Sequence, residues 1–194
     1  MKRLEWMMFA VILLWTGFAD ATTVVELKLE DLLELSDAVI VGDVRSADAF
    51  VEDGRVHTRI RVDVAEVWKG TPDKTVEIVH MGGRTEERAT IVHGMPAFLA
   101  GERVLVFLEQ PNGLSHYVVT GLTQGKYLIE ALPDGGSLVV PQVDLGSVAK
   151  REKVPDNSVQ LQPVTSGLLH GQRLVDFRAR VSALVEAQAE ERKP

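Results

Sequence analysis

The stretch AVIVGDVRSADAFVEDGRVHTRIRVDVAEVWKG, residues 38–70, decides the fold of this chain. In its second half, apolar or small side chains at positions 58, 60, 62 and 64 alternate with charged ones at 59, 61 and 63. Successive side chains of a strand point to opposite faces, so this segment predicts a strand with one apolar and one charged face. Asp53 and Gly54 separate the two halves, and glycine tolerates the positive φ of a tight hairpin turn. The sequence therefore predicts a half-buried β-hairpin in an antiparallel sheet.

Further short strands, separated by turn residues, follow this hairpin. We expect them at residues 74–80, 103–109, 116–120, 126–131 and 137–140. The run at 103–109 is apolar at nearly every position, which predicts a central strand covered on both faces. Helical spacing of apolar residues predicts a short helix within 27–36 and a second helix near the C-terminus. This pattern is typical of an all-β barrel or sandwich with two accessory helices.

The N-terminal segment has the three-part form of a secretory signal peptide. Lys2 and Arg3 precede an apolar run at residues 7–18, and small residues at 19 and 21 fit a cleavage site. The apolar run is shorter than the ~20 residues that cross a bilayer, which favours cleavage over an uncleaved membrane anchor. The predicted organisation is a signal peptide at 1–21, a β-barrel domain at 22–140, a connecting arm at 141–165 and an amphipathic helix at 166–194. We expect an exported protein, periplasmic or extracellular.

Charge and cysteine content narrow the class of partner. The net charge of −7 disfavours nucleic acid and anionic membrane, because both attract clustered lysine and arginine. Membrane contact is then expected only through the signal peptide before cleavage. The chain has no cysteine, so it carries neither a disulfide framework nor a lipoprotein anchor.

No catalytic motif stands out in the sequence. There is no cysteine nucleophile and no Gly-x-Ser-x-Gly elbow, and Gly82-Gly83 lacks the features of a phosphate loop. The five histidines show no metal-ligand spacing, although His80, His93 and His116 could converge in the fold as a zinc site. We therefore predict no enzymatic activity, no metal and no cofactor. A zinc-dependent hydrolase using these three histidines is the alternative, and a structural envelope component that assembles through the C-terminal helix is a third possibility.

An ordered set of motifs resembles a group of uncharacterised exported bacterial β-barrel proteins. The motifs are SDAVIVGDV, VWKG, the HMGG at 80–83, GMPAFLAGERVLVFL and GLTQGKYLI, and with the closing helix they cover residues 29–130 and the C-terminal segment. The resemblance implies an antiparallel Greek-key barrel of OB-like type, similar in fold to netrin-like modules and tissue inhibitors of metalloproteinases. Those inhibitors chelate the protease zinc through an N-terminal cysteine. Here Thr22 would begin the mature chain, so that mechanism does not carry over.

The function that we expect is a non-enzymatic binding module that recognises a protein, peptide or glycan through its barrel loops. Function in such folds usually lies on loops held by a rigid sheet. The glycine-rich loops after the third strand and before the central strand are the candidates. The predicted binding residues are Gly82, Gly83, Arg84, Met95 and Phe98.

Overall fold

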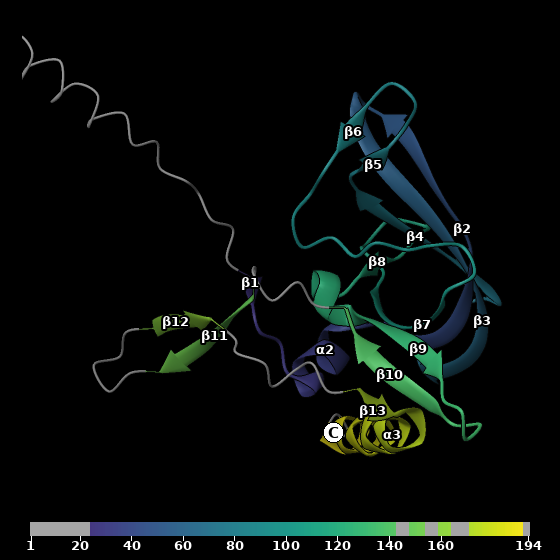
Figure 1. The fold of residues 1–194 in the computed structure, drawn as a ribbon. Helices are drawn as coiled ribbons and strands as arrows, with labels where there is room; N and C mark the ends of the chain where they lie inside the picture. Colours follow the sequence, from purple (N-terminus) through teal and green to yellow (C-terminus); the bar gives the residue numbers. More distant parts are fainter. Residues whose placement is uncertain (1–23, 143–147, 154–158, 164–170, 192–194) are drawn as a thin grey trace, which may run out of the picture.

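The structure, a computed structural model, describes residues 24–142, 148–153, 159–163 and 171–191. The predicted signal peptide lies outside the described residues, as does the start of the predicted mature chain. The described chain is mostly β, with one large antiparallel sheet and two helices (Figure 1). The expectation of a mainly antiparallel β-protein is therefore confirmed at this level.

The predicted hairpin is the longest feature of the sheet. Strand β2 (Ala38–Glu52) pairs with β3 (Arg55–Lys69) over almost its whole length. Asp53 and Gly54 form the turn with φ of 48° and 75°, the left-handed pair that suits the twist of a two-residue hairpin. Three register shifts along the pair bend these long strands. The predicted alternation is confirmed, since Ile60 and Val62 are buried while Arg59 and Arg61 are partly exposed.

The remaining strands extend the hairpin on both sides. The order is β13-β10-β9-β7-β2-β3-β4, with β8 paired to β7. Strand β7 lies next to β2 and is buried from position 104 to 108, as its continuous apolar run predicts. The bounds are β4 (Thr75–Met81), β7 (Arg103–Glu109), β8 (Val118–Val119), β9 (Lys126–Ala131), β10 (Ser137–Pro141) and β13 (Gln172–Arg173).

The chain before β8 returns to the far edge of the sheet. Tyr117 donates its backbone N–H to Glu77 O at 2.8 Å and accepts from the N–H of Val79 at 2.9 Å, both on β4. The next two residues, in β8, pair with β7. The segment around Tyr117 therefore joins the outer strand of one half of the sheet to a strand in its middle.

Two apolar clusters lie on opposite faces of the sheet. Alternate residues of β2 and β7 divide between them: Ile40 and Val106 belong to one, Val41 and Phe107 to the other. Helices α2 (Leu29–Leu35) and α3 (Leu174–Glu191) cover the second cluster. The apolar stripe of α3 packs there as its spacing predicts, through Leu174, Phe177, Val181, Leu184 and Val185. Figure 1 shows both helices at one side of the sheet, far from β5 and β6.

Smaller elements complete the described chain. The polar segment after β4 forms a two-stranded pair, β5 (Gly83–Arg84) with β6 (Ala89–Thr90), and a 3₁₀ turn η1 (Leu122–Gly125) leads into β9. Residues 141–165, predicted as a connecting arm, contain β11 (Val148–Lys153) and β12 (Val159–Pro163), which form a separate sheet with β1 (Val24–Val25). Among the helices of the described segments, none combines the length and the apolar character that crossing a membrane requires.

Candidate functional site

A cavity opens on the face of the β2–β3 hairpin that carries the apolar cluster with Ile40 and Val106, at the end of that cluster. Its volume is about 310 Å³. The floor consists of Ala47 and Ala49 from β2 and Thr58 from β3, whose neighbours along the same face of the hairpin are the larger Val44 and Ile60. The hollow therefore begins where small side chains replace branched ones. The lining residues are Ala47, Ala49, Thr58, His80, Met81, Gly82, Gly83, Arg84, Thr90, Val92, Met95, Pro96, Ala97 and Phe98.

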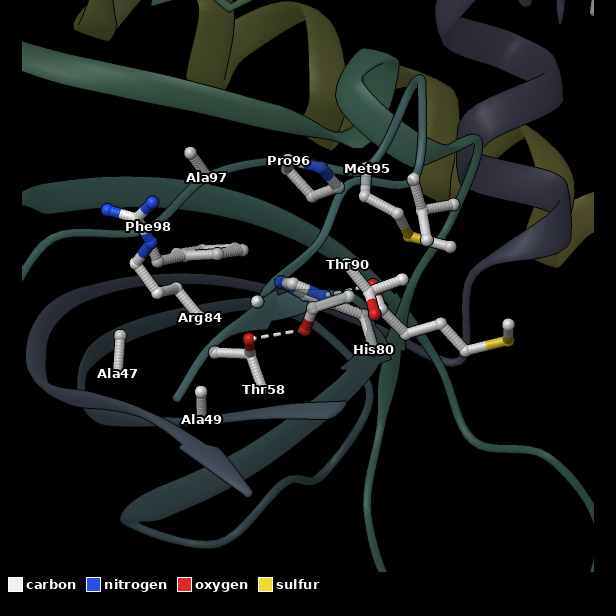
Figure 2. Close-up of a pocket in the computed structure, with 14 residues that line it drawn as sticks. Ala47, Ala49, Thr58, His80, Arg84, Thr90, Met95, Pro96, Ala97 and Phe98 are labelled. Atoms are coloured by element: carbon white, nitrogen blue, oxygen red, sulfur yellow. Dashed lines mark hydrogen bonds between the residues drawn. The ribbon is translucent and has the colours of Figure 1, made fainter. Parts of the chain in front are cut away.

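Gly82 and Gly83 let the backbone cross closely over this floor. The Thr58 hydroxyl donates to Gly82 O at 2.7 Å, and Gly82 N donates to Val56 O at 2.8 Å. Gly83 has φ of 134°, and a Cβ there would lie 2.4 Å from the Thr58 hydroxyl oxygen. Any side chain at position 83 would clash with the floor, so glycine sets how closely the wall approaches. Figure 2 shows the Thr58–Gly82 hydrogen bond at the centre of the site.

His80, near the end of β4, lies between the floor and the segment of residues 95–98 on the opposite side of the cavity (Figure 2). Its Nδ1 lies 3.0 Å from Met81 O, and its ring stacks with that of Phe98 at a centroid distance of 6.4 Å. Burial lowers the pKa of His80, although hydrogen bonds to the backbone of Met81 and Pro96 oppose the shift. The imidazole is therefore neutral at pH 7 and acts as part of the wall.

A buried ammonium group holds the segment opposite the floor. The side chain of Lys126 is fully buried, and Nζ donates to Ala97 O and, at 2.7 Å, to Glu102 Oε2. Nζ also lies 4.4 Å from the centroid of the Phe98 ring, a cation–π geometry. Burial lowers the pKa of Lys126, and the hydrogen bond and charge of Glu102 oppose this. Lys126 therefore ties the roof of the cavity, residues 95–98, to β9.

The electrostatic character of the cavity comes from Arg84. Within the described part of the chain, no aspartate or glutamate lines the cavity, and Arg84 is its one formally charged lining residue. Arg84 is exposed and takes part in no ion pair or side-chain hydrogen bond among the described residues. The cavity thus carries a positive spot on a protein whose net charge is −7.

All five residues predicted for binding line this one cavity: Gly82, Gly83, Arg84, Met95 and Phe98. They come from two loops separated in sequence, which the fold places on opposite sides of the hairpin face. Sequence analysis missed the floor and the Lys126–Glu102 pair. The sequence does contain an indication of the floor: on one face of β2, the alanines at 47 and 49 follow the larger Val44.

The alternative zinc site is not assembled. Among the residues that the structure describes, no three histidine, aspartate or glutamate side chains are grouped so that they could hold a metal ion. Of the three candidate histidines, only His80 lines the cavity; His93 lies exposed in the loop before the roof, and His116 precedes β8. In the described residues, the three candidate histidines are therefore not grouped as a metal site.

Comparison with known proteins identifies no relative: no family model, curated protein or solved structure matches this chain.

The lowered pKa of His80 predicts a pH-dependent stability. Burial disfavours the imidazolium, so the unfolded chain binds more protons and stability rises with pH. The His80 contribution is full above its ordinary pKa of 6.5 and is lost as the pH falls from there through the lowered folded-state pKa. Urea unfolding between pH 8 and pH 5 should show this loss, and His80→Gln should reduce it. His93→Gln, at an exposed position, is the matched control; equal slopes for His80→Gln and the unmodified protein would contradict the assignment.

Proposed function

We propose that this chain is an exported, non-enzymatic binding module that holds a protein, peptide or glycan partner at the cavity between the Gly82–Arg84 wall and the residue 95–98 roof. The observation that carries this proposal is the convergence of the two loops on one open hollow with a rigid floor. The floor belongs to the longest strand pair of the sheet, so the site does not depend on the loops alone.

The chemistry of the lining supports binding more than catalysis. Most of the lining residues are apolar or glycine, with Thr58, Thr90, His80 and Arg84 as the polar members. General acid–base catalysis needs a proton donor or acceptor with a partner that orients it. His80 instead stacks on Phe98 and hydrogen-bonds to backbone oxygen, contacts that fix the wall in place.

The rim favours a macromolecular partner. Three exposed large apolar residues either line the cavity or follow a lining residue in sequence: Met81 at 43%, Ile91 at 84% and Leu99 at 66%. Exposed apolar groups that gather around a hollow are typical of an interaction surface. A partner larger than the cavity would cover them on binding.

For the fold, we propose that β2, β3, β4, β8 and β7 form an OB-like barrel. The contacts of Tyr117 with β4, followed by the pairing of β8 with β7, support this closure. The cavity would then lie at one mouth of the barrel, a usual position for ligands in such folds.

A filled-cavity variant tests the binding proposal. Ala49→Leu should place a branched side chain in the hollow, whereas Ala65→Leu makes the same change at an exposed position of β3 outside the cavity. We expect the unmodified protein, immobilised, to capture a defined partner from the exported fraction of its own cells. Ala49→Leu should lose that partner and Ala65→Leu should keep it, with matching thermal unfolding curves as the folding control. Capture of nothing by the unmodified protein, or equal capture by both variants, would count against the proposal.

A further inference from the structure

The charge and shape of the cavity point to the kind of partner. We propose that the site binds a peptide segment of a partner protein in which an apolar residue lies next to an aspartate or glutamate. The apolar side chain enters the hollow and the carboxylate pairs with Arg84. This inference rests on the proposed binding function and specifies its partner.

Arg84 differs from most arginines of the large sheet, although Arg55 of β3 also forms no ion pair among the described residues. Arg45, Arg59, Arg61 and Arg103 each form an ion pair with a carboxylate of a neighbouring strand. Arg84 lines the cavity without an acidic partner among the described residues. An unpaired guanidinium offers two parallel N–H donors that match the two oxygens of a carboxylate.

The hollow beside Arg84 suits an aliphatic side chain. Its floor presents the methyl groups of Ala47 and Ala49. From the roof, Met95, Pro96 and Phe98 face them (Figure 2). A leucine-sized group placed there would lose its contact with water at no cost in buried charge. A lysine or arginine in the same place would bring like charge to Arg84, which disfavours basic segments.

The open rim favours a peptide over a free small molecule. Small-molecule sites usually enclose most of their ligand. Here Ile91 and Leu99, exposed at 84% and 66%, lie next to the lining residues Thr90 and Phe98 in sequence. A peptide that continues past its anchor residue can cover these side chains, whereas a compact molecule cannot.

Four probes separate the parts of this proposal by two-dimensional amide NMR. They are acetyl-Gly-Leu-Glu-Gly-amide, the same peptide with Gln for Glu, the same peptide with Gly for Leu, and free 4-methylpentanoate. We expect the first to shift the amides of Gly82, Gly83 and Arg84. The Gln peptide should bind about threefold to fivefold more weakly, the range of an exposed ion pair. The Gly peptide should bind about tenfold more weakly or worse, because it lacks the buried side chain.

Two arginine variants test the residue assignment. Arg84→Gln should bring the Glu peptide to the affinity of the Gln peptide. Arg88→Gln removes a guanidinium from the same β5–β6 segment, outside the cavity lining, and should leave the preference intact. Because both positions are exposed, neither change should disturb folding.

Each outcome bears on the proposal. Equal binding of the Glu and Gln peptides, an unchanged preference in Arg84→Gln, or binding of 4-methylpentanoate as tight as that of the peptide would overturn it. A lack of shifts with every probe would do so too. If the immobilised protein still captures a partner that Ala49→Leu loses, only the peptide chemistry is wrong. If capture also fails, the binding function itself is wrong.

Discussion

Glu102→Ala should destabilise the protein by about 3 kcal/mol, because it leaves a buried ammonium group without its counter-charge. Lys126 is fully buried and Glu102 is 18% exposed, and their Nζ and Oε2 atoms lie 2.7 Å apart. The same carboxylate oxygen accepts from the N–H of Leu99 at 3.1 Å. Loss of the carboxylate therefore removes both an ion pair and the hydrogen bond to the backbone of Leu99, the residue that follows the roof. Urea unfolding at pH 7 measures the change.

Lys126→Met provides the sharpest comparison. Methionine fills much of the same volume and removes the fully buried ammonium group; the Glu102 carboxylate loses its counter-charge, but it is 18% exposed and keeps the N–H of Leu99 as a donor. Replacing a buried charge with an apolar group costs less than stranding it. We expect Lys126→Met to be less destabilising than Glu102→Ala, and Glu87→Ala, at an exposed position outside these contacts, to be nearly neutral. A larger loss for Lys126→Met would mean that its hydrogen bonds to Ala97 and Gln142 outweigh the ion pair.

Phe177→Ala should cost about 3–4 kcal/mol and loosen helix α3 from the sheet. Phe177 is 6% exposed, and its ring lies 5.3 Å from that of Tyr127 and 6.4 Å from that of Trp68. Phe177 thus packs α3 against aromatic rings of two strands, β3 and β9. Urea unfolding measures the loss, and Val175→Ala, exposed at 69% on the same helix, should change stability little.

Tyr127 supplies a second measurement for the same variant. Burial raises the pKa of Tyr127 to about 12. Removal of the Phe177 ring should admit water and bring this pKa closer to its ordinary value of 10.0 in a spectrophotometric titration. If α3 served instead as an assembly face, Phe177→Ala would change the molecular mass in light scattering and leave both the stability and the tyrosine titration unchanged.

The hairpin and the central strand could be predicted from sequence because their signals are local. Alternation at residues 58–64, the Asp53-Gly54 turn and the apolar run of β7 each require only neighbouring residues. The loop after β4 could be predicted for a similar reason. Gly82 and Gly83 adopt positive φ angles and close contacts that leave little room for a Cβ, and two adjacent glycines indicate such a bend in the sequence.

The features that could not be predicted from the sequence mostly depend on contacts between distant segments. Lys126 appears polar in sequence, and its burial depends on Glu102, 24 residues away, and Ala97, 29 residues away. Ala47 and Ala49 become a floor only because β5 returns across them. Strands β11 and β12 lie among prolines and polar residues, where the alternation signal is weak.

The placement of the helices has a practical consequence for experiments on surfaces. Helix α3 packs on one face of the sheet, whereas the cavity opens from the cluster on the other face. A linker attached to the outward side of α3, at Val175 for example, would orient the molecule with its hollow toward solution. On sensor chips and affinity resins prepared in this way, the hollow should be accessible in more molecules than after random coupling through lysines.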